Sequence, residues 1–581
     1  MSVTRDPNEP AEAAANPKPM HKVRAPIDTS RGVPTPTAEF NRARKLVADS
    51  GLLGPLQELL DSPTGRPRSL SVEGFLVAFM LKGMHLKHGG LVVDVARILN
   101  AFTDGQRQAL GIKNWNEKEA YDRTDRLFVK LDRALRTGWA TKINGTETRI
   151  DEQWFADRLA WASIADLPVT SRSLAVDGTA VETWGSWDGA FGKEGYDGEP
   201  ETRPTDSSKA SKKTPKSKAQ DAPIGPDNRR IYTTDVDARA GWRTATNNRR
   251  AGYYNGYELH LATQTRDITS VNGIDKVKLG PDVPNVVTSW RLTPAGSHRA
   301  NAIVPALVEA KEAGQEIDDV VWDRGYSQCV PETTVYPLGR AGIRTTFWPM
   351  DHQRRREPYT TEAIVLEGML FTDYLPEELK VQLPMPPEGS SEEEKLEYEE
   401  AFNRRARYRY QLHQRPDEDG FTRWLCPFHA GFLRSRELPD TMRRPATTPL
   451  VDLPKGATCC QGIVSASPEE LPLWQQFTPG TTAWRISMGR RNVVEGANGG
   501  LKGNFVNIER KFMRVMGLTK MTIMLAFTIA GMNLEIIRSF KAKKEVVRRL
   551  AQKPKKRMKR RDGTLAQILD AAPRPTGRAP P

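Results

Sequence analysis

Two aspartates in this chain each close a short apolar stretch, where a ligand at the edge of a sheet would find them. Asp177 follows the apolar residues of SLAVDG, and Asp323 those of DDVVWDRGYS. Ligands gather at the carboxyl ends of strands in α/β sheets, and Gly178 and Gly325 permit a tight turn after each acid. Taken alone, either aspartate is more typical of a helix cap or a turn than of a ligand site.

A third acid stands among cations in the segment AWRISMGRRNVVEGANGGLKGNF, residues 483–505. A helix over 490–502 would place four polar residues on one face, at spacings of 4, 3 and 4: Arg491, Glu495, Asn498 and Lys502. Its apolar residues would lie on a different face: Val493, Ala497 and Leu501. An ordinary surface stripe of ion pairs would show the same spacing.

Three carboxylates are what a two-metal site for phosphoryl transfer needs, because oxygen ligands hold Mg²⁺ while it bridges substrate phosphates. One ion activates the attacking water or 3′-hydroxyl, and the other stabilises the leaving oxygen. We therefore predict that Asp177, Asp323 and Glu495 are catalytic and bind two Mg²⁺ ions, for which Mn²⁺ substitutes. Polar side chains near Glu495 would contact DNA: Arg485, Arg490, Arg491, Asn498 and Lys502.

Charge supports a polyanionic partner. The 581 residues carry a net charge of +14, whereas residues 480–561 alone hold 21 basic and 4 acidic side chains. A basic field this concentrated favours nucleic acid, and a solubilising tail is the alternative. No GxxxxGK[ST], GxSxG or HExxH motif points to another enzyme class.

The composition also bounds the compartment. Four cysteines do not make a disulfide scaffold, and no signal peptide is visible. The longest apolar run, residues 521–534, is shorter than the roughly 20 residues of a membrane helix and predicts a buried helix. We expect an intracellular, reduced protein with no membrane partner.

Pattern and composition divide the chain into segments. Strand-like stretches include GYELHLATQTR, NVVTSWRLTP and GIRTTFW, and RANAIVPALVEAKEAG predicts a helix. The expected organisation is a disordered 1–37, a helical 38–165, an α/β core 166–350 with a mobile loop at 186–229, a β-rich insertion 351–480, final core helices 481–540 and a disordered basic tail 541–581.

Weaker signals lie in and around the insertion. Cys426 and His429 with Cys459 and Cys460 would be an unusual zinc site, and buried free thiols are the expected alternative. We expect His260 to be a sheet residue rather than a base. Core packing is likewise the expected role of two tryptophans that would otherwise stack on an unpaired base: Trp348 and Trp484.

Four of these stretches together resemble the DDE transposases of bacterial insertion sequences, members of the RNase H-like, retroviral-integrase superfamily: LAVDGT, GYELHLAT, VVWDRGYS and RRNVVEGANGGLK. One group of that family carries a Tyr-(2)-Arg-(3)-Glu-(6)-Lys signature. Arg491, Glu495 and Lys502 match its spacing, but Met488 stands at the tyrosine position, which puts one contact to the transposon end in doubt. The resemblance covers about 170–350 and 480–540.

The resemblance implies an α/β fold: an RNase H-like mixed sheet flanked by helices, an N-terminal all-α domain for DNA ends, and a β-rich insertion before the last catalytic helix. It implies metal-dependent cleavage at transposon ends and strand transfer into target DNA, by a homodimer on double-stranded DNA in the bacterial cytoplasm, associated with the nucleoid. Two alternatives remain open: a transposase-derived DNA-binding protein without cleavage, and an RNase H-like nuclease that cuts without joining.

Overall fold

The structure is a computed structural model. It describes residues 34–61, 68–85, 90–186, 222–243, 251–270, 277–360, 362–387, 389–414, 416–438, 444–455, 462–503, 507–508 and 513–552. The predictions for 1–33, for most of the 186–229 loop and for 553–581 lie outside these residues, as do Cys459 and Cys460. The chain divides into two compact units, a large one that ends at Ile537 and a short one that begins at Arg538.

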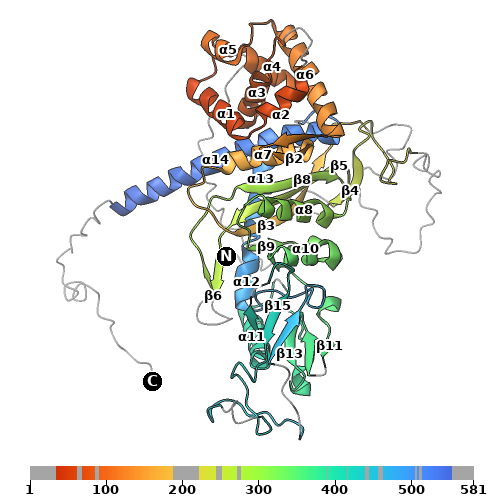
Figure 1. Cartoon of the computed structure of the whole chain (residues 1–581), viewed down its shortest axis with the longest axis vertical. Coiled ribbons are helices and arrows are strands. Elements are labelled where there is room, and N and C mark those ends of the chain that lie inside the picture. The colour runs from red at the N-terminus through yellow and green to blue at the C-terminus, as the bar shows by residue number, and fades with distance from the viewer. Residues whose placement is uncertain are drawn as a thin grey trace, which may run out of the picture. The chain divides into compact units, whose positions relative to one another are not determined.

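The first described segment is a group of helices, red to orange in Figure 1. They are α1 (Thr37–Asp49), α2 (Leu53–Leu60), α3 (Val72–Met84), α4 (Val92–Asn100), α5 (Asp104–Leu110), α6 (Glu117–Thr137) and α7 (Glu152–Ile164). Capping boxes at Thr103 and Asn116 satisfy the first backbone N–H groups of α5 and α6. The predicted all-α region also contains a hairpin, β1 (Trp139–Ile143) and β2 (Thr146–Ile150).

A mixed six-stranded sheet forms the next layer. Its strands are β3 (Ser173–Glu182), β4 (Arg239–Arg243), β5 (Gly252–Thr265), β8 (Val287–Pro294), β9 (Asp319–Trp322) and β10 (Arg344–Thr346). The order is β10-β9-β3-β5-β4, with β8 also paired to β5; β3, β9 and β10 are parallel, and the other pairs are antiparallel. The α/β class and the mixed sheet are therefore confirmed, and a small hairpin, β6 (Ile268–Ser270) with β7 (Val277–Leu279), extends from β5.

Helices cover both faces of this sheet. On one face, α8 (Arg299–Glu312) buries Ile303 and Leu307 in a cluster with Val176 of β3. On the other, α13 (Asn492–Leu501) packs against β3 and β5. The buried residues of α13 are Val494, Ala497 and Leu501, so the predicted apolar face was wrong at one position, because Val493 is only partly buried.

The region 351–480 folds into two three-stranded antiparallel sheets and a helix. The sheets are β11 (Glu357–Thr360), β12 (Ala363–Leu366) and β13 (Met369–Thr372), and β14 (Gln411–Gln414), β15 (Thr422–Leu425) and β16 (Ile463–Ala466). The helix is α11 (Glu392–Ala406), which holds six of the nine Glu in residues 376–400 and begins with a capping box at Ser391. The insertion therefore combines β-structure with one acidic helix.

The remaining helices are α9 (Arg324–Ser327), α10 (Val335–Arg340), α12 (Thr482–Gly489) and α14 (Leu518–Gln552). The last of these runs past the predicted end of ordered structure at 540. By length and composition α14 could cross a membrane, but its apolar residues between Met521 and Met532 are buried within the first unit. The unit that starts at Arg538 is the basic end of this helix, with six Lys or Arg and one Glu up to Gln552.

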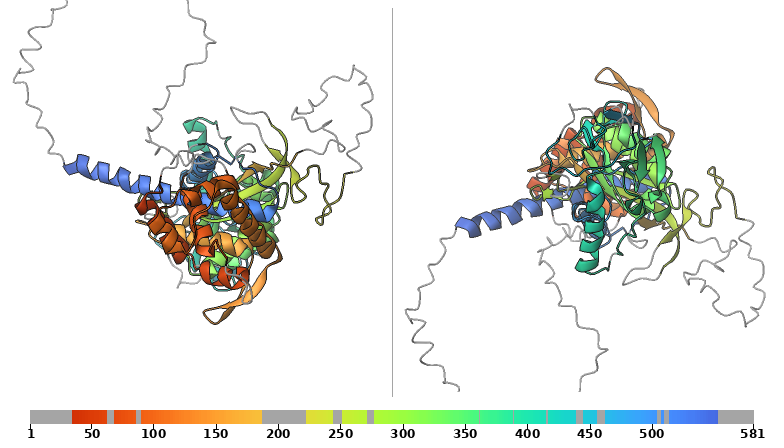
Figure 2. Two further views of the ribbon diagram at one scale, coloured as in Figure 1. Left: turned by 90° about the horizontal axis from the view of Figure 1, so that it is seen from above. Right: turned by 90° about the horizontal axis from the view of Figure 1, so that it is seen from below.

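Figures 1 and 2 show the first part of α14 beside the N-terminal helices. Two glycines, Gly83 of α3 and Gly531 of α14, let these two helices cross in close contact. A Cβ on Gly83 would lie 2.1 Å from the Phe527 carbonyl oxygen, and one on Gly531 would lie 2.1 Å from the Gly83 carbonyl oxygen. Because both obstacles are backbone atoms, neither can move aside. The crossing fixes the N-terminal helices against the helix that follows α13.

We expect Gly531→Ala to lower the free energy of unfolding by about 1–3 kcal/mol, the usual cost of overpacking. Gly105→Ala in α5 is the matched control, because a Cβ there has no neighbour within 4 Å. It should be neutral or slightly stabilising, since alanine favours helix over glycine. Urea denaturation of both variants checks this, and equal stability of the two would contradict the close crossing.

Candidate functional site

The pairing of β3 with β9 brings the two predicted aspartates together. The strands are parallel, and their last paired residues are Val176 and Trp322. Asp177 and Asp323 are the next residues along the chain, and neighbouring strands lie about 4.8 Å apart. Two carboxylates that are 146 positions apart in the sequence are therefore neighbours where β9 ends beside β3. The prediction that the first strand closes at Asp177 was wrong, because β3 continues to Glu182, paired with β5.

Each aspartate is held by local hydrogen bonds. The Asp177 carboxylate accepts from the Gly178 backbone N–H at 2.8 Å and from the Asn498 side-chain amide at 3.1 Å. The Asp323 carboxylate caps α9 by accepting from the Arg324 N–H at 2.7 Å. The backbone N–H that follows each aspartate thus holds its carboxylate, and Asn498 of α13 also holds that of Asp177.

Glu495 reaches the same place from α13, through Arg491. The Arg491 guanidinium lies 2.7 Å from the Glu495 carboxylate and 3.2 Å from that of Asp323. The side chain of Glu495 is 53% exposed and that of Asp323 is 41% exposed, so solvent reaches the group. The structure therefore gathers Asp177, Asp323, Glu495, Arg491 and Asn498 at one site.

The electrostatics of the site favour a cation. The pKa of Asp177 is raised to about 6, chiefly by burial and also by the neighbouring Asp323 carboxylate, while the Gly178 N–H, Arg491 and Arg299 act in the opposite direction. Like charges on adjacent strands repel each other unless a cation lies near both. In this structure the Arg491 guanidinium supplies part of that positive charge.

The donor atoms fit a hard divalent cation. Carboxylate and amide oxygens are the ligands that Mg²⁺ and Mn²⁺ accept, and the buried Oδ1 of Asn498 has no hydrogen-bond partner among the described residues. No three Asp, Glu, His or Cys side chains of the described chain converge around one point. The Arg491 guanidinium lies between Asp323 and Glu495, and it would have to leave for both to bind one ion.

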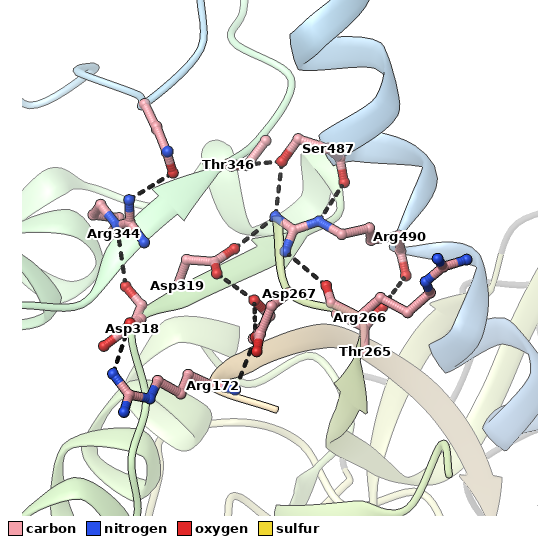
Figure 3. Close-up of polar contacts among 12 residues, drawn as sticks. Arg172, Thr265, Arg266, Asp267, Asp318, Asp319, Arg344, Thr346, Ser487 and Arg490 are labelled. Carbon is pink, nitrogen blue, oxygen red and sulfur yellow. Dashed lines mark hydrogen bonds and ion pairs between the residues drawn. The ribbon is translucent and has the colours of Figure 1, made fainter. Parts of the chain in front are cut away.

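Arg490 does not have the predicted role. Its guanidinium is buried, 2% exposed, and lies 2.6 Å from the Asp319 carboxylate at the start of β9. Figure 3 shows it donating also to Ser487 and to the Arg266 carbonyl oxygen. The prediction that Arg490 contacts DNA was wrong, because the guanidinium is buried and each of its three nitrogens already donates inside the protein.

The buried pair has a positioning role instead. Asp319 begins the strand that ends one residue before Asp323, and Arg490 lies five residues before Glu495. Thr265 at the end of β5 also donates to the Arg490 carbonyl oxygen, at 3.3 Å. These contacts fix the start of α13 against β5 and β9, and so place Glu495 relative to the two aspartates.

The other two predicted DNA contacts lie away from the carboxylates. Arg485 donates to the Gly480 carbonyl oxygen at 2.7 Å and to Thr482 at 2.9 Å, and lies 3.7 Å from Glu399 of α11. Lys502 follows the last turn of α13, where its backbone bridges to Asn507. Arg485 therefore joins α12 to the insertion, and partly exposed Lys502 is the C-cap of α13.

The weaker candidates are mostly structural. His260 is fully buried between Tyr326, at 2.9 Å, and Thr293, at 3.2 Å, and burial lowers its pKa to about 3. Trp484 packs edge-on against Trp348 with ring centroids 5.0 Å apart, and it is almost completely buried.

Of the possible zinc ligands, Cys426 is buried in the hydrophobic core of the insertion, beside Trp424 and Phe428. Its two predicted partner cysteines lie outside the described residues, so the zinc prediction stays open.

Sequence reasoning missed Asp319, Glu258 and Arg299. Asp319 carried no signal apart from its place at the start of an apolar strand. Arg299 lies near enough to Asp177 and Asp323 for each carboxylate to raise its pKa, and it pairs with Glu258 at 2.9 Å.

Comparison with models of known protein families finds no match to this chain, and no curated protein matches it either.

Proposed function

We propose that this chain is a DDE-type DNA transposase with an RNase H-like catalytic core. One observation carries the proposal: Asp177 within β3 and Asp323 just after β9 follow the last paired residues of two parallel strands, and Arg491 joins Asp323 to Glu495 of α13, which packs on β3 and β5. A mixed sheet with helices on both faces and an insertion before α12 agrees with the resemblance stated from the sequence.

The reaction proposed is hydrolysis of a phosphodiester at each transposon end, followed by attack of the freed 3′-hydroxyl on target DNA. Two Mg²⁺ ions, for which Mn²⁺ substitutes, would activate the attacking oxygen and stabilise the leaving one. Asp177, Asp323 and Glu495 would hold them. Asn498 orients the Asp177 carboxylate through its amide, and its free Oδ1 faces no other described partner.

Arg491 has two tasks in this proposal. Without metal its guanidinium neutralises Asp323 and Glu495. With a divalent cation held by these carboxylates, the Arg491 guanidinium would be free to hold a DNA phosphate beside the site with two parallel hydrogen bonds. The partners proposed are double-stranded DNA and a second copy of the chain, in the bacterial cytoplasm and associated with the nucleoid.

A supercoiled plasmid carrying the DNA ends that flank the gene tests the function. The wild-type protein with Mg²⁺ or Mn²⁺ should nick at the ends and then produce joined products. Nicking without joining would favour the RNase H-like nuclease. Binding of the ends without any cleavage in either metal would favour the DNA-binding protein and overturn the transposase proposal.

The raised pKa of Asp177 predicts a pH dependence. Because the folded protein binds this proton more tightly than the unfolded chain, the group stabilises the fold at low pH, and that contribution is lost as the pH rises from about 4 to about 6. Metal binding needs the ionised form. We expect the Mn²⁺ affinity of the DNA-free protein to fall about tenfold per pH unit below pH 6, measured by titration calorimetry; a flat profile from pH 5 to 7 would contradict it.

A further inference from the structure

The two glycines beside the catalytic aspartates leave space for side chains from elsewhere in the fold. A Cβ on Gly178 would lie 2.9 Å from a carboxylate oxygen of Glu258, and one on Gly325 would lie 2.1 Å from a guanidinium nitrogen of Arg299. Neither glycine has a positive φ. Close approach, rather than backbone conformation, is therefore what excludes a side chain at both positions.

Glu258 and Arg299 are partners in one ion pair. Glu258 lies on β5, opposite Ala180 of β3, and its side chain is 9% exposed. Arg299 is the first residue of α8 and reaches the Glu258 carboxylate at 2.9 Å. One pair thus occupies the space left at Gly178, next to Asp177, and the space left at Gly325, two residues after Asp323.

Tyr326 makes a second set of contacts that hold the turn after Asp323. Tyr326 follows Gly325, is completely buried, and stacks on Trp322 with ring centroids 5.7 Å apart. Its hydroxyl and the His260 ring lie 2.9 Å apart, and His260 pairs with Gly178 across the β3–β5 ladder. The turn after Asp323 is therefore attached to β5 through both Arg299 and His260.

We propose that the Glu258–Arg299 ion pair is a positioning device for the metal site: it fills the spaces at Gly178 and Gly325 and so fixes Asp177 and Asp323 at the separation that a bound divalent cation needs. The inference rests on the proposed metal-dependent function. Neither side chain is a ligand. Their effect passes through the two glycine backbones: Gly178 follows Asp177 within β3 and donates its N–H to that carboxylate, and Gly325 lies in α9, whose N-cap is Asp323.

The test is Mn²⁺ binding to the DNA-free, full-length protein, measured by titration calorimetry with circular dichroism as a check of folding. The double variant Glu258→Gln/Arg299→Gln keeps the net charge. It should weaken Mn²⁺ binding about 10–100-fold, the usual effect of removing partners of metal ligands. The control, Asp157→Asn/Arg291→Gln, removes a buried pair 2.8 Å apart on β8 and α7 and should bind Mn²⁺ within twofold of wild type.

A second variant tests the same positioning role even if the double variant does not fold. Gly325→Ala displaces only the flexible end of Arg299, so the protein should fold and still bind Mn²⁺ at least tenfold more weakly than wild type. Mn²⁺ affinity within twofold of wild type for either folded variant would overturn the positioning role, and so would an equal loss in the control. If the wild type itself binds no Mn²⁺, the metal-dependent function fails together with the inference.

Discussion

Asp177→Asn, Asp323→Asn and Glu495→Gln should each reduce DNA cleavage by roughly 10³-fold or more, the scale of loss when a catalytic group is removed. Each amide keeps the shape of the side chain but removes the charge that holds a divalent cation. In Asp177→Asn the side-chain oxygen can still accept from the Gly178 N–H, so β3 should keep its geometry at this position. The loss should therefore appear in the chemical step.

Binding must be measured beside cleavage, because the proposal separates the two. The affinity of each variant for end DNA in EDTA should equal that of wild type within about threefold, or exceed it slightly, since a negative charge is removed near phosphates. Asp318→Asn is the matched control: it changes a carboxylate at the other end of β9 that lies 3.8 Å from Arg172. A control that loses cleavage as strongly as Asp323→Asn would contradict the assignment.

Arg490→Ala should lower the free energy of unfolding by about 3–5 kcal/mol, because it leaves the buried Asp319 carboxylate without its partner. The same change removes the bonds to Ser487 and to the Arg266 carbonyl oxygen, which hold the start of α13. The effect should be seen in urea denaturation. Cleavage should fall as well, since Glu495 lies on the helix that loses its anchor.

Two comparisons make this result specific. Arg485→Ala, at a partly exposed arginine of the preceding helix, should cost no more than about 1 kcal/mol. Adding Asp319→Asn to Arg490→Ala should recover part of the stability, because no charge is then left unpaired. An Arg490→Ala protein as stable as wild type, with weaker DNA binding, would instead restore the DNA contact predicted from the sequence.

The core of the site was predictable because its signals are local. Apolar runs before Asp177 and Asp323 located β3 and β9, although β3 continues past Asp177 to Glu182. The order of the strands within the sheet was not predicted. The spacing of Arg491, Glu495 and Asn498 placed them on one helix face, and the structure gathers all three with the aspartates.

The predictions that were wrong, and the residues that were missed, depend on contacts between segments far apart in the sequence. Arg490 and Arg491 are adjacent, and only the position of Asp319, 171 residues away, decides which one turns inward. Likewise the choice of Val494 over Val493 for burial follows from how α13 lies on β5. Glu258 and Arg299 have no pattern of their own, since their pairing depends on the register of β5 and the start of α8.

The hairpin of β1 and β2 was not predicted, although the sequence contains a signal for it. Asn144-Gly145 between two alternating stretches is a strong hairpin signal, and both residues have positive φ, as the tight turn between β1 and β2 requires. The extension of α14 past residue 540 has a different cause: a high density of Lys and Arg favoured a disordered tail, although these residues are also good helix formers.

Anomalous scattering from Mn²⁺, in crystals of the protein bound to end DNA, would show whether the three carboxylates form a metal site. We expect a peak about 2.0–2.3 Å from oxygens of Asp177 and Asp323, a contribution from Glu495, and the Arg491 guanidinium moved onto a DNA phosphate. Saturating Mn²⁺ that produced no peak there, with Arg491 still between Asp323 and Glu495, would contradict the account.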